Sequence, residues 1–324
     1  MQGSIEHHII SELNENLVIK RRDIPKHLLI TPGINYLLKN AALDWFMVIF
    51  FWVVIIYLPI WIYPLSAILI ASRFHSFGVI LHDATHMSMK RKTFRFRLLE
   101  ILVGYPIGST INAMRYHHLR HHKDSGMPSD PYFKKEVDGN KVIKYLFILK
   151  AFILAPFWTL RGLYGTLAFY VKPLRNSYAK IFLQDKSGKD CSQSKEVIQC
   201  ASEDRFQLIF HLIIYSALIW APRFFLLAYF IPVLLSGIFA GYRLLNEHNY
   251  IETTDRKMET IIATTRDNHL KGILRFFLAP KNIGYHIVHH LHPQVAWYKL
   301  PELREWYLEN CNEIYTGAEQ KCNL

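Results

Sequence analysis

The stretch "WFMVIFFWVVIIYLPIWIY", Trp45 to Tyr63, contains no charged residue. At a rise of about 1.5 Å per residue, a helix of this length comes close to the roughly 30 Å thickness of a bilayer's hydrocarbon core. In lipid, backbone N–H and C=O groups must pair with each other, and a helix pairs them within one segment. The stretch therefore predicts a first membrane-spanning helix and, with it, an all-α integral membrane protein.

Three further apolar segments extend this prediction. Leu65 to Leu81 is interrupted only by Arg73, His75 and serines, and it predicts a helix that returns the chain across the bilayer. Phe206 to Trp220 and Phe224 to Leu245 are separated by "APR" and predict a second hairpin. The sequence thus favours spanning helices that come in pairs.

The stretch Tyr145 to Tyr170 is ambiguous, because charged residues and prolines interrupt an apolar run. It could either span the bilayer or lie in its interface. If all histidine-rich segments meet at one site, Tyr116 to His122 and Asn246 to Tyr250 must lie on the same side of the membrane. An additional crossing between them would separate them, so we expect Tyr145 to Tyr170 at the interface.

This assignment gives four transmembrane helices in two hairpins, interfacial helices and a cytoplasmic, histidine-rich cap. Basic residues precede the first span and follow the second, which places both termini in the cytoplasm by the positive-inside rule. We expect a polar N-terminal segment at residues 1–44, one membrane domain at 45–310 and a C-terminal tail at 311–324. The localisation is thus predicted to be multi-pass, with the active site on the cytoplasmic side.

Composition supports a membrane protein. The apolar fraction is 51% and the formal net charge is +12, which fits a nucleic acid, an anionic membrane surface or an acidic protein partner. The apolar segments favour the membrane, and no nucleic-acid partner is expected. The cysteines form no Cys-x-x-Cys pair and are predicted to be free thiols in a reducing compartment; they are Cys191, Cys200, Cys311 and Cys322.

Histidines recur at helical spacing in three places. On a helix, residues three or four apart share a face. The first set is His82 and His86, the second is His118, His121 and His122, and the third is His286, His289 and His290. Protonated imidazoles crowded on one face would repel each other, whereas a metal ion binds them neutral. The three sets therefore predict a metal site, although imidazole suits iron, zinc, copper or nickel.

Two metals with roughly four protein nitrogens each would leave one position open. His248, in "NEHNY", is the candidate for a ninth ligand, and Asn246 is one of its polar neighbours. His117 is either an orienting neighbour of the ligands or the true start of the second set. A lone histidine is usually exposed or hydrogen-bonded, which is our interpretation of His27, His211 and His269.

Other residues near these sets are candidates for supporting roles. Asp83 could accept a proton from the second nitrogen of a ligand. Arg73 and His75 are costly inside a span unless they are paired or functional, so each is a candidate for substrate contact or for a structural hydrogen bond. Asn282 and Trp297 could shape the site or an acyl tunnel, with interfacial packing as the alternative for the indole.

The chain resembles the membrane fatty acid desaturase family. The resemblance rests on "SRFHSFGVILHDATH", "YHHLRHHKDSGMPSDPY", "NEHNY" and "NIGYHIVHHLHPQVAWYKLPEL", which together reach from about Arg73 to Leu303. It implies a four-helix membrane protein in which the three histidine boxes and His248 hold two irons. It also implies O2 as co-substrate and a reaction that removes two hydrogens from a fatty acyl chain.

No His-Pro-Gly-Gly motif of a fused cytochrome b5 appears, so we expect a separate electron donor such as ferredoxin or cytochrome b5. The basic run Lys90 to Arg97, with Lys134 and Lys135, could dock an acidic carrier or anchor helix ends to lipid headgroups. Two other functions remain open. One is a hydroxylase or ketolase of the same superfamily acting on a lipid or carotenoid; the other is a histidine-rich metal transporter or sensor.

Overall fold

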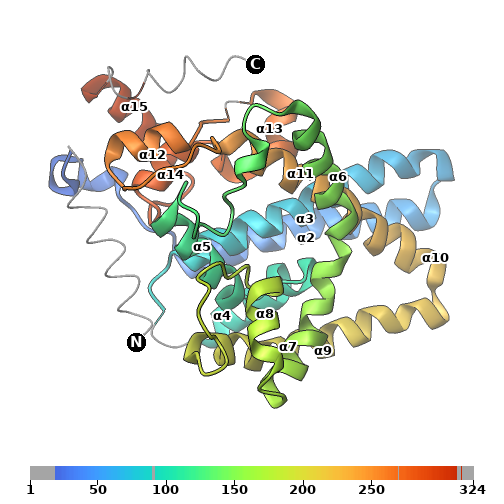
Figure 1. Ribbon diagram of the computed structural model, residues 1–324. Helices are drawn as coiled ribbons and strands as arrows, with labels where there is room; N and C mark the ends of the chain where they lie inside the picture. The colour runs from blue at the N-terminus through green and yellow to red at the C-terminus, as the bar shows by residue number, and fades with distance from the viewer. Residues whose placement is uncertain (1–18, 90–91, 269, 312–314, 316–324) are drawn as a thin grey trace.

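The computed structural model describes residues 19–89, 92–268, 270–311 and 315 (Figure 1). Within these residues every regular element is a helix, and the only strand-like pairing is an isolated bridge between His248 and Thr265. The all-α prediction is therefore confirmed. Much of the predicted N-terminal segment and C-terminal tail lies outside the described residues, as do Lys90, Arg91, His269 and Cys322.

The first two long helices form a hairpin, but their bounds differ from the predicted ones. Helix α2 runs from Ile34 to Tyr57, a short 3₁₀ turn follows, and α3 runs from Tyr63 to Thr85. The predicted first span began at Trp45 because Asp44 precedes it. In the structure Asp44 is buried, with Arg73 at 3.0 Å and Lys281 at 3.4 Å from its carboxylate oxygens. The charge is thus neutralised and does not end the helix.

Among the described residues, three helical segments are long and apolar enough to cross a membrane, namely 34–57, 60–85 and 222–247. The last comprises α10 (Pro222–Phe225), a π-helix (Leu226–Phe230) and α11 (Ile231–Glu247). A fourth candidate is the pair Lys141–Leu154 and Pro156–Tyr170, bent by 42°. The predicted span Phe206–Trp220 lies in α9 (Lys195–Trp220), which is not among these segments. The structure thus offers the stretch we expected at the interface as its fourth candidate.

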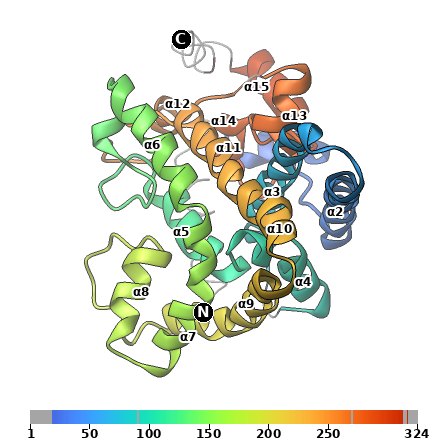
Figure 2. The same cartoon turned by 90° about the vertical axis from the view of Figure 1, so that its right-hand side faces the viewer.

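The long helices share one end of the molecule. Helices α2, α3, α9 and α10 project to the right in Figure 1. Their surfaces and the 3₁₀ turn between α2 and α3 expose aromatic and aliphatic side chains, including Phe46 at 71%, Trp220 at 73% and, in the turn, Trp61 at 77%. Such exposed apolar surface is expected where a protein faces lipid. Figure 2 shows α3 between α2 and α11, and α3 packs against both.

The shorter helices complete the fold and gather mainly at the other end. Helix α5 packs against α3, and α14 contacts both α12 and α15. Their bounds are α4 Phe94–Leu99, α5 Ile111–Asp124, α6 Lys141–Leu154, α7 Arg161–Tyr170, α8 Leu174–Phe182, α12 Met258–Thr264, α13 Gly272–Leu278, α14 His286–Leu291 and α15 Leu300–Asn310.

Candidate metal centre

Nine buried histidines gather in two groups, and they are the nine that the sequence predicts as ligands. In each group, every imidazole offers one nitrogen, and these nitrogens lie within 4.8 Å of one another. The first group is His82, His86, His118, His122 and His289; the second group is His121, His248, His286 and His290. Residues far apart in sequence therefore converge on two sites able to hold a metal ion.

Helix geometry decides how each box is divided. In α5, His118 and His122 are four residues apart and enter the first group, whereas His121 enters the second. In α14 the assignment is reversed, because the i, i+4 pair His286 and His290 belongs to the second group and His289 to the first. Adjacent histidines point about 100° apart around a helix, so one box can serve both groups.

The remaining ligand candidates come from helix ends. His82 lies in the last turn of α3, and His86 is the residue that caps that helix. His248 caps the C-terminus of α11 in an extended conformation. Each of these helices is a candidate span, so the two groups form where the long helices end.

Imidazole nitrogens face each other at short distances. In the first group, Nε2 of His118 lies 2.8 Å from Nε2 of His86 and 2.9 Å from Nε2 of His122, which is 3.1 Å from Nε2 of His289. In the second, Nε2 of His248 lies 2.9 Å from that of His121 and 3.1 Å from that of His286. Several lone pairs thus converge on a small volume, as in a ligand set for a cation.

Burial favours the neutral form of seven of these imidazoles. Burial lowers the pKa of both His86 and His248 to about 3. Burial also lowers the pKa of five other histidines outside the candidate spans well below the usual value; they are His118, His122, His286, His289 and His290. Neutral imidazole is the form that binds a metal.

Asp130 orients one imidazole of the second group. Its carboxylate accepts a hydrogen bond from Nδ1 of His121 at 2.8 Å and others from the backbone N–H groups of Gly126 and Tyr132. Burial alone would raise the pKa of Asp130, but His121 and these N–H groups together lower it below its usual value. Sequence reasoning missed Asp130, although it stands in the turn-rich "DSGMPSDPY" after the second box.

His117 lies outside both groups. Its Nδ1 is 2.7 Å from the hydroxyl of Tyr132, whose ring packs against His121 with centroids 4.4 Å apart. Of the two roles left open by the sequence, this placement favours that of a neighbour. Tyr132 is a second residue that the sequence did not single out.

The other predicted neighbours have different partners. The Asp83 carboxylate is 3.8 Å from Nδ1 of His82, too far for a hydrogen bond, and it accepts from the backbone of Trp297. Asn246 donates to the carbonyl of Tyr242 one turn earlier. Another carboxylate, that of Glu247, lies 3.6 Å from Nδ1 of His286.

Asn282 and Trp297 contact each other beside the boxes. The Asn282 amide donates to the Trp297 carbonyl at 3.1 Å, and the indole N–H donates to the Tyr36 hydroxyl at 3.1 Å. Tyr36 belongs to α2. Their hydrogen bonds therefore tie the segment after the third box to the first long helix.

The polar residues within the candidate spans are mostly paired. Arg73 binds Asp44 and the carbonyl of Phe276, and its guanidinium lies 3.7 Å from the centre of the Phe276 ring. His75 packs against Phe239, and its Nε2 is buried without a hydrogen-bond partner among the described residues. The contacts of Arg73 are those of a structural ion pair.

Comparisons with known proteins agree with the geometry. The family model described as fatty acid desaturase matches residues 58–319. The chain is also similar to the sphingolipid delta(4)-desaturase of Candida albicans, at 27% identity over 236 residues that cover 69% of this chain. The chain spans only 56% of the length of that relative. The matched length shows that the chain belongs to the fatty acid desaturase family, a family of oxidoreductases.

Proposed function

We propose that this protein is a membrane-bound, O2-dependent desaturase that introduces a double bond into the acyl chain of a lipid at a di-iron centre. The observation that carries the proposal is the convergence of nine buried histidines into two adjacent groups within a chain of the desaturase family. A pair of groups, rather than one, is what a dinuclear centre requires.

The histidines of the two groups would each hold one iron. Both ring nitrogens of His82 and of His290 are buried without a hydrogen-bond partner among the described residues, and so is Nδ1 of His118, His122 and His289. Unpaired buried polar atoms are costly, and a metal ion bound to one nitrogen of the His82 ring or of the His290 ring would satisfy that nitrogen. In His118, His122 and His289 the nitrogen that faces the group is Nε2, and Nδ1 points away from it. A donor set of imidazoles suits iron, and membership in the family favours iron over zinc or copper.

When bound, the irons would supply the oxidising power to remove two hydrogens from an unactivated pair of methylene carbons with O2. The protein's own part is placement and protection. All nine imidazoles are at most 7% exposed, so bulk water is kept from them. Asp130 fixes the ring of His121, and the ring of Tyr132 packs on it. Fixed ligands hold the reacting centre in one geometry.

The proposed topology has four spans with the histidine groups on the cytoplasmic side. It is supported by the long apolar helices and by the position of the groups at the ends of α3 and α11. Basic residues before the first span and after the second favour a cytoplasmic location, among them Lys20, Arg21 and Arg95. Single cysteines placed in α9 and in the bent α6–α7 pair, labelled from either side, would identify the fourth span.

The substrate we propose is the alkyl chain of a lipid. The similar protein from Candida albicans is named as a sphingolipid desaturase, so sphingolipids are included with fatty acyl esters. A separate donor such as ferredoxin or cytochrome b5 would supply electrons. Of the basic run considered for docking it, Lys92 is buried in ion pairs with Glu100 and Glu203 and is therefore not a docking residue.

The test is expression in a host that lacks the activity, followed by mass analysis of acyl chains and sphingolipid bases. We expect products lighter than their precursors by two hydrogens. A gain of one oxygen would instead establish a hydroxylase of the same superfamily. Purified protein should contain two irons per chain; zinc alone, together with metal transport, would contradict the enzyme and favour the transporter.

A further inference from the structure

We propose that two buried carboxylates, those of Glu100 and Asp267, are positioning residues. They fix the starts of α5 and α14, the two helices that each carry three of the histidines, relative to the rest of the protein. The proposal rests on the metal centre proposed above and extends it. Each carboxylate accepts a hydrogen bond from a first-turn backbone N–H of a helix that carries three of the histidines, at Ile111 in α5 and at Ile287 in α14.

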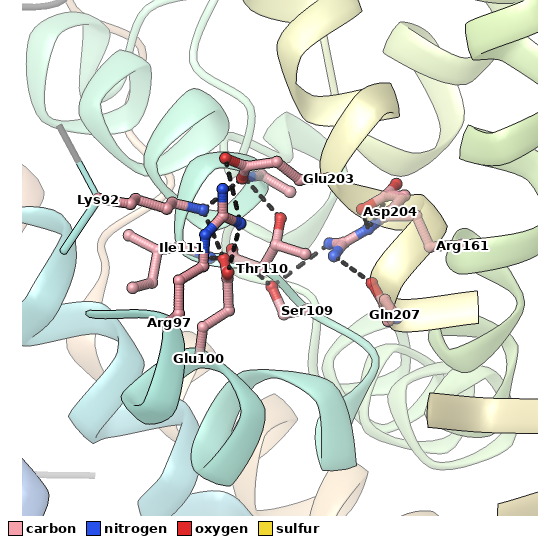
Figure 3. A network of polar contacts seen from close by, with 11 residues as sticks. Lys92, Arg97, Glu100, Ser109, Thr110, Ile111, Arg161, Glu203, Asp204 and Gln207 are labelled. Atoms are coloured by element: carbon pink, nitrogen blue, oxygen red, sulfur yellow. Dashed lines mark hydrogen bonds and ion pairs between the residues drawn. The ribbon is translucent and has the colours of Figure 1, made fainter. Parts of the chain in front are cut away.

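Glu100 lies in a π-helical segment, Glu100–Gly104, directly after α4, and its side chain is fully buried. One carboxylate oxygen is 2.7 Å from the backbone nitrogen of Ile111, the first residue of α5, and 2.7 Å from Nζ of Lys92 (Figure 3). Thr110, the N-cap of α5, accepts from the backbone of Ala113. Two of the N–H groups that a helix start leaves unpaired are therefore satisfied, beside a negative charge that the helix dipole favours.

The carboxylate is itself held in place by other helices. Lys92 also pairs with Glu203 of α9, and Arg97 lies 3.5 Å from Glu100 and 3.7 Å from Glu203. Figure 3 shows these groups together with Arg161 of α7, which contacts Asp204 of α9 and donates to Ser109 beside the start of α5. The start of α5 is thereby fixed relative to two helices that carry no box histidine.

Asp267 has the same arrangement at α14. One of its oxygens is 2.8 Å from the backbone nitrogen of Ile287, and the other accepts from the hydroxyl of Tyr315 at 2.7 Å and lies 3.3 Å from Nε of Arg304. Its side chain is 1% exposed. Helix α14 spans only His286–Leu291, and so short a helix is unstable without such outside contacts.

The position of these carboxylates matters because a rigid helix moves all its histidines together. A shift of α5 displaces two ligands of the first group and one of the second, whereas a shift of α14 displaces one of the first and two of the second. Loss of Glu100 should therefore weaken mainly the first group, and loss of Asp267 mainly the second. A general loss of stability would show no such reversal.

The experiment uses full-length protein in detergent, loaded with ⁵⁷Fe, and measures iron per chain and the two Mössbauer components during exposure to a chelator. The variants are Glu100→Gln, which keeps volume and an acceptor oxygen, Glu100→Ala, which removes both, and Asp267→Asn. The matched control is Glu196→Gln, because Glu196 pairs with Arg120 of α5 at 2.6 Å but lies at the partly exposed side of that helix. Thermal unfolding of each metal-free variant reports the fold separately.

We expect Glu100→Ala to release the iron of the first group about 10-fold faster than wild type, which is the lower end of the effect of losing an orienting contact. Glu100→Gln should release this iron faster than wild type but more slowly than Glu100→Ala. Asp267→Asn should show the opposite preference, and Glu196→Gln should match wild type. The proposal would be overturned if the two irons left in the same order in all variants. It would also be overturned if neither the Glu100 variants nor the Asp267 variant released iron faster than wild type. Wild-type protein that binds two irons without desaturating lipid would refute the proposed reaction alone; wild-type protein without iron would refute the metal centre.

Discussion

The two histidine groups differ in what supports them. In the second group, Nδ1 of His121 donates to Asp130, Nδ1 of His248 lies 3.0 Å from the Leu244 carbonyl, and Nδ1 of His286 faces Glu247. In the first group, Nδ1 of His118, His122 and His289 has no hydrogen-bond partner in the described part of the chain. The first group has more imidazoles, whereas in the second group the imidazoles of His121 and His248 are each held by a hydrogen bond at Nδ1.

This difference predicts that the two metal positions are chemically distinct. A carboxylate that accepts from the second nitrogen of an imidazole fixes its orientation and makes it a stronger donor. The four-histidine group should therefore favour the oxidised metal more than its smaller ligand number suggests. The five-histidine group relies on ligand number and on dense packing, with ring centroids of His82 and His118 only 4.1 Å apart.

The largest effect should come from removing one ligand of each group. His118→Ala should empty the first group and His121→Ala the second, and each should lower desaturation by more than about 100-fold, since even the loss of an orienting contact costs roughly 10- to 100-fold. Iron per chain and Mössbauer spectra would show which component is lost. His27→Ala is the control. If both variants lost both irons together, the two groups would act as one unit and the comparison would fail.

Asp130→Asn should weaken the second group and spare the first. The substitution keeps the shape of the side chain but removes the negative charge behind His121, so iron in the second group should bind about 10-fold more weakly. Titration with a competing chelator measures the affinity. Asp138→Asn, on the exposed part of the same loop, is the matched control. Equal weakening of both groups would mean that Asp130 supports the fold rather than one imidazole.

Glu247→Gln should have a smaller effect of the same kind. Its carboxylate is 3.6 Å from Nδ1 of His286, beyond hydrogen-bonding distance, and 3.2 Å from Nε of Arg243. We expect a fewfold loss of iron affinity in the second group, less than for Asp130→Asn. The same chelator titration tests this order. A larger effect than that of Asp130→Asn would show that Glu247, not Asp130, is the main carboxylate of the second group.

Much of the fold and of the ligand set follows from local sequence. Hydropathy over the length of a helix identifies the candidate spans around Trp45 and Leu81, and i, i+3 and i, i+4 spacing selects the box histidines, because both signals are local in the sequence. The predicted start of the first long helix, at Trp45, was wrong because Asp44 lies inside the helix. Its charge is neutralised by Arg73 and by Lys281, which is distant in sequence. A hydropathy scan does not contain such a partner.

The division of the boxes was beyond sequence for a related reason. Spacing shows that His118, His121 and His122 share a side of a helix, but only the packing of α5 against α3 decides which of them faces which group. Asp130 and Tyr132 were missed because they reach the imidazoles from a loop, where no periodicity marks a side chain. The sequence predicts Asp83, the neighbour of His82 in the chain, as the carboxylate that orients a ligand. In the structure the carboxylate that binds His121 is Asp130, which lies in a loop.

The smallest expected effect concerns Tyr132, which contacts the second group without a charge. Tyr132→Phe removes the hydroxyl that pairs with His117 but keeps the ring packed on His121. A neutral hydrogen bond contributes only about 1 kcal/mol, so iron affinity and desaturation should fall by less than about 10-fold. Tyr132→Ala, which removes the ring as well, should cost more. If Tyr132→Phe emptied the second group while Asp130→Asn did not, orientation of His121 through Asp130 would have to be abandoned in favour of a path through His117.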